Sequence, residues 1–153
     1  MSLSEFRFCH ALRVRWSETD AQGVVFNARY LDYGDIAITE YWRAVGFRFG
    51  EAESLEFHVA RAEVDYKRPI KPDEKLNLWA RTERIGNSSM TVLIEIHGAG
   101  DANTPDDGEE DLRASLRLVQ VHVDLATHAP MRVPNCVRDD FTAFDSRAEI
   151  FRT

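Results

Sequence analysis

The sequence predicts an α+β fold in which one long helix packs across a curved antiparallel sheet. A helical pattern of apolar residues runs from about residue 28 to 45, and several stretches around it alternate apolar and polar residues as strands do. The 153 residues are 44% hydrophobic and 29% charged, which is typical of an ordinary globular protein. We therefore expect a single domain over residues 1–153, since two domains of this total length would each bury little core.

The first expected element is a strand over residues 5–16. Its apolar face carries Phe6, Phe8, Leu12, Val14 and Trp16, and its other face carries Arg7, Arg13 and Arg15. His10 shares the apolar parity, so we interpret it as a histidine at the edge of the core with a backbone partner, in preference to a catalytic group.

The second expected element is the long helix, which follows a tight loop that turns at Gly23. Asn27 is expected to be the N-cap, so that the helix begins near Ala28 and continues to Val45, and Gly46 is expected to end it. One polar stripe consists of Asp32, Asp35, Thr39 and Arg43. The other sides carry Tyr30, Leu31, Tyr33, Ile36, Ala37, Ile38, Tyr41, Trp42 and Val45. So wide an apolar arc predicts a helix wrapped by a sheet, with a narrow exposed strip.

The rest of the chain is predicted to be mostly β. Residues 57–68 place Ala60, Ala62, Val64 and Tyr66 on one face, and Pro69 and Pro72 end this strand. Further alternation predicts strands over residues 76–80, 90–96 and 112–125, with a turn at 85–88 and a mobile surface loop over 98–111. The parity changes within 112–125, which indicates a bulge or burial on both faces. From residue 130 onward, a short helix near 139–141 and simple packing on the sheet both remain open.

Composition excludes several classes of protein. The formal net charge of −7 argues against nucleic-acid binding, although local basic residues can still hold an anionic coenzyme. Cys9 and Cys136 lack the spacing of a zinc site or a disulfide framework, so we expect two reduced, packed thiols and neither a metal nor a redox cofactor. The sequence lacks a bilayer-spanning apolar run and a signal-peptide core at its first residues, so we expect a cytoplasmic protein without a membrane partner.

The chemistry is expected where the first strand leads into the helix. Asp20 lies on the loop seven residues before Asn27, beside the unpaired backbone N–H groups of a first helical turn. A carboxylate next to such donors is suited to acyl transfer, with a base or nucleophile on one side and oxyanion donors on the other. The alternative is a carboxylate that only caps the turn at Gly23.

Residues 19–30, with the sequence TDAQGVVFNARY, closely resemble the signature of the hot-dog-fold acyl-CoA thioesterases of the 4-hydroxybenzoyl-CoA thioesterase type. A second stretch, residues 59–74, resembles the strand that follows the helix in this family and its Tyr-x-x-Pro turn. The resemblance implies a hot-dog fold, in which a curved antiparallel sheet is wrapped around one long central helix.

The resemblance also implies an acyl-CoA thioesterase in which Asp20 acts as general base or nucleophile and the backbone N–H of Asn27 binds the oxyanion. Many relatives carry His at the position of Asn27; Asn keeps an amide donor, and a role as cap alone or as cap plus substrate contact stays open. Expected substrate contacts are Gly23, Val24, Val25, Phe26, Tyr30, His58, Val59 and Arg61. The acyl group remains open, because the aromatic residues of the helix suit a core as well as a pocket.

The basic cluster that holds coenzyme phosphates in relatives is neutral here, at Gly86 to Ser89. The candidates for these contacts are Arg68, Lys71, Arg84 and Arg132, with Arg61 and Lys67 as further basic residues. The resemblance implies a homodimer or a dimer of dimers with active sites at the subunit interface. The alternatives are a thioesterase that acts on acyl carrier protein and a non-catalytic acyl-CoA-binding module. A hydratase is disfavoured, since no His lies near Asp20 in the sequence.

Overall fold

The computed structural model describes residues 2–47, 55–100 and 111–153, which form a six-stranded sheet, two α-helices and two short 3-10 helices. The strands are β1 Phe8–Arg13, β2 Phe57–Tyr66, β3 Lys75–Ile85, β4 Ser89–Gly98, β5 Leu112–His122 and β6 Phe151–Arg152. Their spatial order is β2-β5-β4-β3-β1-β6. Neighbouring strands are antiparallel except β1 and β6, so the expectation of a purely antiparallel sheet is wrong at this edge. There the chain returns beside β1 after the last helix.

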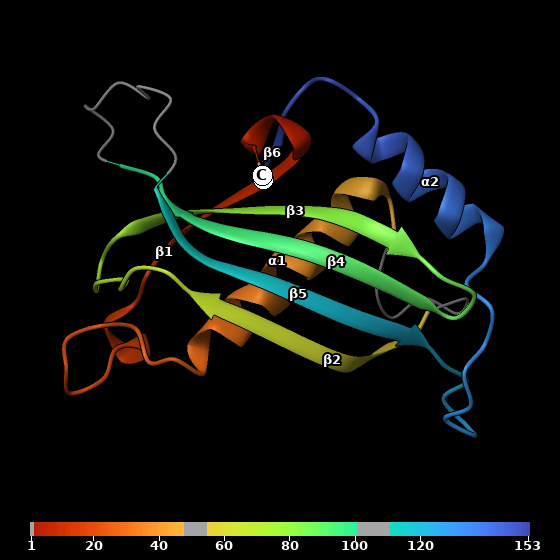
Figure 1. The fold of residues 1–153 in the computed structure, drawn as a ribbon, viewed down its shortest axis with the longest axis horizontal. Helices are drawn as coiled ribbons and strands as arrows, with labels where there is room; N and C mark the ends of the chain where they lie inside the picture. Colours follow the sequence, from red (N-terminus) through yellow and green to blue (C-terminus); the bar gives the residue numbers. More distant parts are fainter. Residues whose placement is uncertain (1, 48–54, 101–110) are drawn as a thin grey trace.

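Helix α1, Arg29–Val45, crosses one face of the sheet (Figure 1). Its buried residues are Tyr30, Tyr33, Gly34, Ala37, Ile38, Tyr41 and Trp42, and they pack with the inward residues of the strands. The central strand β4 contributes Met90, Val92, Ile94 and Ile96, all fully buried, which confirms the alternation predicted there. The main core therefore lies between α1 and this face of the sheet.

The start of α1 differs from the prediction. The N-cap is Ala28, which has helical backbone angles, and no side chain caps the helix, so the assignment of Asn27 as N-cap is wrong. The chain enters the helix through a turn in which the N–H of Arg29 donates to the carbonyl of Phe26, leaving the side chain of Asn27 exposed. At the other end Gly46 is the C-cap with φ +120, a conformation that favours glycine, as the sequence predicts.

Several apolar residues lie elsewhere than their parity predicts. Strand β1 ends at Arg13 and a 3-10 helix follows at Trp16–Glu18, so Trp16 is 72% exposed instead of buried. Phe6 packs on the opposite face of the sheet with Cys9 and Trp79.

Three further assignments are corrected. Leu31 and Ile36 are 43% and 36% exposed, because they lie on the outer side of α1. The ring of His10 hydrogen-bonds the Thr153 hydroxyl instead of a backbone group. Cys136 is exposed, whereas Cys9 is buried as expected.

The structure also decides the ambiguous segments. Residues after 130 form helix α2, Asn135–Asp145, which buries Val137, Phe141 and Phe144. On β5, Leu116 and Leu118 enter the core while Val119 and Val121 are half-buried, so the parity change reflects burial on both faces. The expected mobile loop over 98–111 lies largely outside the described residues.

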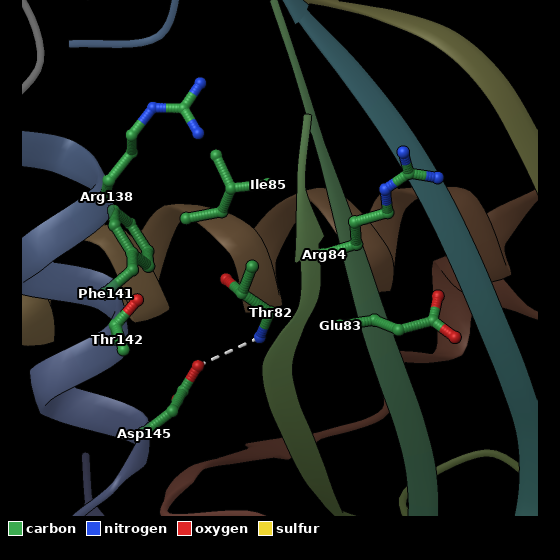
Figure 2. Close-up of a pocket in the computed structure, with 8 residues that line it drawn as sticks. All are labelled: Thr82, Glu83, Arg84, Ile85, Arg138, Phe141, Thr142 and Asp145. Carbon is green, nitrogen blue, oxygen red and sulfur yellow. Dashed lines mark hydrogen bonds between the residues drawn. The ribbon is translucent and has the colours of Figure 1, made fainter. Parts of the chain in front are cut away.

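Helix α2 is joined to the core by the half-buried carboxylate of Asp145. The Tyr41 hydroxyl donates to Asp145 Oδ2 at 2.5 Å. The backbone N–H of Thr82 donates to the same oxygen at 3.0 Å (Figure 2). Asp145 Oδ1 is buried and has no hydrogen-bond partner among the described residues. Burial raises the pKa of Asp145 above its usual range, although the hydrogen bonds from Tyr41 and Thr82 act in the opposite direction. A cavity of about 420 Å³ lies beside this carboxylate, between α2 and the end of β3.

The raised pKa predicts how this site affects stability. The folded state holds the Asp145 proton more tightly than the unfolded chain, so stability decreases as the pH rises from about 3.9, the usual value, through the folded-state pKa. Asp145→Asn does not titrate and keeps an acceptor oxygen. We expect its unfolding free energy, relative to wild type, to rise between pH 3.5 and 7 in urea titrations. The control is Asp139→Asn, the same chemical change at an exposed position of α2; a flat or opposite trend for Asp145→Asn would contradict the prediction.

Candidate functional site

The Asp20 loop, residues 19–25, is a tight hairpin. Thr19 and Val25 form an antiparallel bridge, and the N–H of Asp20 donates to the carbonyl of Val24 at 2.9 Å. The N–H of Gly23 returns to the carbonyl of Asp20 at 3.0 Å. Gly23 has φ +75, a left-handed conformation that disfavours residues with a Cβ. The loop is therefore ordered by its own backbone.

The Asp20 side chain is half-buried. Its Oδ1 accepts the backbone N–H of Gln22 at 2.8 Å, so the turn-capping contact exists. No group among the described residues hydrogen-bonds Oδ2. One carboxylate oxygen therefore orients the side chain, and the other remains available to a substrate or a water molecule.

The N-terminus of α1 provides unused donors. In the described part of the chain, the backbone N–H groups of Asn27 and Ala28 have no acceptor, whereas that of Arg29 bonds the Phe26 carbonyl at 2.9 Å. The hydroxyl of Tyr66, at the end of β2, donates to the carbonyl of Asn27 at 2.9 Å and so orients the peptide that leads into the helix. These free N–H groups lie at the positive end of the helix dipole, where a developing negative charge is favoured.

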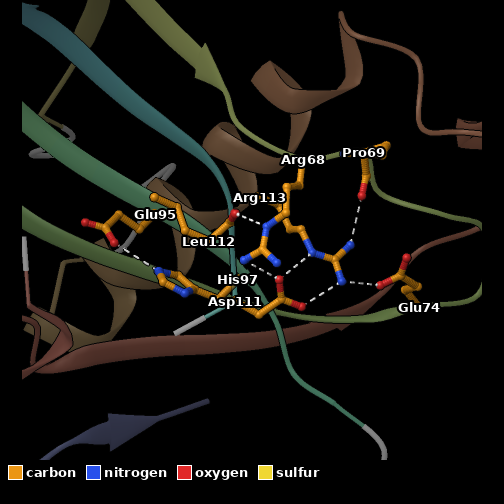
Figure 3. Close-up of polar contacts among 8 residues, drawn as sticks. All are labelled: Arg68, Pro69, Glu74, Glu95, His97, Asp111, Leu112 and Arg113. Atoms are coloured by element: carbon orange, nitrogen blue, oxygen red, sulfur yellow. Dashed lines mark hydrogen bonds and ion pairs between the residues drawn. The ribbon is translucent and has the colours of Figure 1, made fainter. Parts of the chain in front are cut away.

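The loop is anchored to the segment between β2 and β3. The N–H of Val25 donates to the carbonyl of the fully buried Ile70 at 2.8 Å. Arg113 supports this segment from β5, because its guanidinium donates to the Pro69 carbonyl at 3.0 Å and pairs with Glu74 and Asp111 at 2.8 Å (Figure 3). The hydrogen bonds from Arg113 hold the pKa of Asp111 below its usual range. In the segment that anchors the loop, the charge of Arg113 is thus compensated by Glu74 and Asp111.

The four candidate phosphate contacts are not equivalent. Arg68 pairs with Asp111 at 2.8 Å, whereas the Lys71 side chain has no charged partner among the described residues. Both lie within two residues of Ile70, whose carbonyl accepts the Val25 N–H, and they are therefore near the Asp20 loop. Arg84 is near the end of β3, and Arg132 precedes α2 at the same end of the sheet, where the Val133 N–H donates to the carbonyl of Asn87 in the β3–β4 turn. Since α1 spans about 25 Å, a single chain does not bring these two arginines to Asp20.

The predicted contacts on β2 are also distant from Asp20 within one chain. Tyr66 contacts Asn27, but His58 is eight residues away along the same strand, which is about 26 Å. His58 is exposed, with its ring centroid 5.7 Å from that of His128, and Arg61 pairs with Glu63. The structure therefore divides the predicted contacts between two ends of the molecule.

Of the contacts predicted around the loop, Phe26 is exposed and Val24 is half-buried. Val25 and Tyr30 belong to the core, where Tyr30 packs edge-on against Tyr66 with centroids 4.8 Å apart. In an isolated chain, Val25 and Tyr30 therefore act first as packing residues.

Large apolar side chains are exposed on the segments that flank the Asp20 loop, on α1 and on β2, an edge strand of the sheet. They are Trp16, Phe26, Leu31, Ile36, Val59 and Tyr66. Ala60 and Ala62, which share one face of this strand with Val64 and Tyr66, are exposed too, and the β2–β5 register shifts between Val59 and Arg61. Exposed apolar side chains on an edge strand with unpaired backbone groups are typical of a protein interface.

Sequence reasoning missed two residues beside the loop. Glu18 is only 6% exposed, and its Oε1 accepts the Tyr33 hydroxyl at 3.1 Å and the Arg15 N–H at 2.7 Å. Burial, followed by the negative charge of Glu18, raises the pKa of Tyr33. No local sequence pattern reveals the hydrogen bond between Tyr33 and Glu18, because the two residues are fifteen positions apart. From the sequence, Tyr33 is expected only as an aromatic residue on an apolar side of the helix.

Two further findings concern the described residues alone. No group of three or more His, Cys, Asp or Glu side chains in this part of the chain is arranged to hold a metal ion. None of its helices is long and apolar enough to cross a membrane.

Comparisons with known proteins agree on one family. A family model described as the thioesterase-like superfamily matches residues 14–141. The acyl-CoA thioesterase YbgC of Haemophilus influenzae is 34% identical over 91 residues, which cover 58% of this chain and 65% of that protein. The acyl-CoA thioester hydrolase YbgC of Escherichia coli is 27% identical over 143 residues, or 92% of this chain and 98% of that protein. A thioesterase structure from Thermus thermophilus, complexed with coenzyme A and Zn, has a TM-score of 0.77 at 26% identity, covering 94% and 98% of the two chains.

Proposed function

Because the chain belongs to the thioesterase-like superfamily and is a thioester hydrolase, we propose that it hydrolyses acyl-CoA to a free acid and CoA at the Asp20 loop. The observation that carries this proposal is the Asp20 carboxylate on an ordered loop that leads directly to the unpaired N–H groups of Asn27 and Ala28. We propose a single hot-dog domain in which the sheet wraps around α1.

Two routes fit these groups. In the first, the Asp20 carboxylate takes a proton from water while the water oxygen attacks the thioester carbonyl carbon. In the second, a carboxylate oxygen attacks that carbon directly to give an anhydride, which water then hydrolyses. In both, the carbonyl oxygen becomes negative and the N–H of Asn27 stabilises it. The C–S bond then breaks, and the CoA thiolate takes up a proton.

The complete site is proposed to need two chains. Antiparallel pairing of β2 with β2 of a second copy would cover the exposed Val59 and Tyr66 and bring His58 and Val59 of one chain towards Asp20 of the other. The same pairing would bring Arg84 and Arg132 from the far end of one chain towards the coenzyme bound at the other. A homodimer, or a dimer of such dimers, follows from this arrangement.

The test is a panel of short, long and aryl acyl-CoA thioesters, assayed by release of free thiol, with molar mass measured in the same buffer. We expect turnover of at least one member by a dimer or larger assembly. Each acyl group is also presented on acyl carrier protein. Turnover of only the carrier-bound esters would replace CoA by the carrier as the substrate. Binding of CoA esters without any turnover would instead identify a non-catalytic binding module.

A further inference from the structure

Glu18 is a buried carboxylate next to a solvent-accessible loop. Trp16 and Ser17 before it are exposed and Asp20 after it is half-buried, yet Glu18 is only 6% exposed. A buried carboxylate is costly unless hydrogen bonds compensate for its lost hydration. Here Oε1 accepts two such bonds, from Tyr33 and Arg15, and Oε2 lies 3.6 Å from the Arg15 guanidinium.

The same residue holds both ends of the Asp20 loop. The backbone carbonyl of Glu18 accepts the N–H of Phe26 at 3.0 Å, so the chain on either side of the loop meets at this residue. Between the loop and the first helical hydrogen bonds, the N–H groups of Asn27 and Ala28 are unpaired within the described residues. The backbone joins loop and helix there through the bond from the Arg29 N–H to the Phe26 carbonyl, at 2.9 Å.

The Glu18 side chain adds a direct connection to the body of α1. Tyr33 is 1% exposed and packed in the main core, so its hydroxyl is a rigid reference point one turn into the helix. The 3.1 Å hydrogen bond from this hydroxyl therefore relates the start of the loop to the helix itself.

We propose that Glu18 is a positioning residue, which holds the Asp20 carboxylate in register with the free N–H groups of α1 through Tyr33. This role rests on the hydrolysis proposed above. Glu18 itself does not contact the reacting atoms. A displacement of about 1 Å between a catalytic group and its oxyanion donors is enough to cost on the order of a hundredfold in rate, so a positioning contact has a measurable effect on kcat.

The experiment compares Glu18→Ala, Glu18→Gln, Tyr33→Phe and the double variant Glu18→Ala/Tyr33→Phe on the best acyl-CoA of the panel. We expect Glu18→Ala to lower kcat by about 10- to 100-fold with KM changed less than about threefold. Glu18→Gln keeps an acceptor oxygen for Tyr33 and Arg15, so its kcat should stay within about threefold of wild type. The double variant should lose no more than the worse single variant, because both changes break one contact.

The control is Glu149→Ala, an exposed position whose side chain has no hydrogen bond or ion pair among the described residues. Circular dichroism sets an assay temperature at which every variant is folded, which separates a loss of kcat from a loss of stability. If Glu18→Ala does not fold, Tyr33→Phe, which removes a single oxygen, replaces it. Wild-type kcat in the folded variant, a change confined to KM, or full additivity in the double variant would overturn the proposal.

A second measurement separates this inference from the proposed activity. Amide hydrogen exchange of Gly23, Val25 and Phe26 reports the order of the loop without any substrate. We expect faster exchange at these amides in Glu18→Ala, and wild-type exchange in Glu18→Gln. If the protein hydrolyses no thioester but this pattern holds, the proposed function fails and the positioning contact stands. Unchanged exchange in Glu18→Ala overturns the positioning role whether or not the protein is active.

Discussion

Asp20→Asn is expected to lower kcat for acyl-CoA hydrolysis by about a hundredfold or more. An amide neither accepts a proton from water at neutral pH nor attacks a thioester, so both routes proposed for Asp20 are lost. The substitution is nearly isosteric, and its amide oxygen can still accept the Gln22 N–H that orients the side chain. The loop should therefore keep its shape, and KM should change much less than kcat.

The measurement is steady-state thiol release by variant and wild type at matched oligomeric state. Asp139→Asn on α2 is the matched control, because it makes the same chemical change at an exposed position away from the loop. Its kcat should equal that of wild type. If Asp20→Asn retains wild-type activity, Asp20 only caps the turn at Gly23, and the catalytic assignment fails although the family membership is unaffected.

Gly34→Leu is expected to destabilise the protein by about 2–3 kcal/mol through overpacking. Gly34 faces β5 from the middle of α1, and a Cβ placed there would lie 3.0 Å from Leu116 Cδ2 and 3.4 Å from Leu118 Cδ1. A Cβ would also lie 3.8 Å from Ile94 Cδ1. A larger side chain therefore has no space unless the helix moves away from the sheet.

Urea unfolding of Gly34→Leu and Gly34→Ala tests this argument. The Ala methyl meets mainly the flexible end of Leu116, and the gain in helix propensity of about 1 kcal/mol offsets that contact. Gly34→Ala should thus remain within about 1 kcal/mol of wild type. Equal stability of Gly34→Leu and wild type would show that α1 does not approach the sheet this closely.

The expected elements correspond well to the structure where periodicity and burial agree. Met90, Val92, Ile94 and Ile96 alternate in the sequence and all point into the core, because a central strand with one apolar face has only one favourable orientation. The end of α1 at Gly46 also follows from a local property, since glycine adopts positive φ without strain.

Local patterns fail where two or more segments determine the outcome. Asn27 is a residue type that favours the N-cap position. The turn that closes onto Phe26 and the hydrogen bond from Tyr66 instead make Ala28 the N-cap. Trp16 and Ile36 have the parity of core residues, yet a 3-10 helix and the outer side of α1 expose them. Hydrophobic alternation identifies the apolar face of a strand or helix, but it does not identify the segment that packs on this face.

By itself, the sequence determined the α+β class, the order of the main elements and the family, because these follow from periodicity and from a contiguous motif around Asp20. The roles of Asp20 and Asn27 remain predictions that rest on that motif. Only the tertiary structure decided that Glu18 is buried against Tyr33, that Arg68 is paired with Asp111, and that the predicted contacts lie at two ends of the folded molecule. The physical reason is that burial and charge pairing depend on which distant segments pack together, and a local sequence pattern contains no information about this packing.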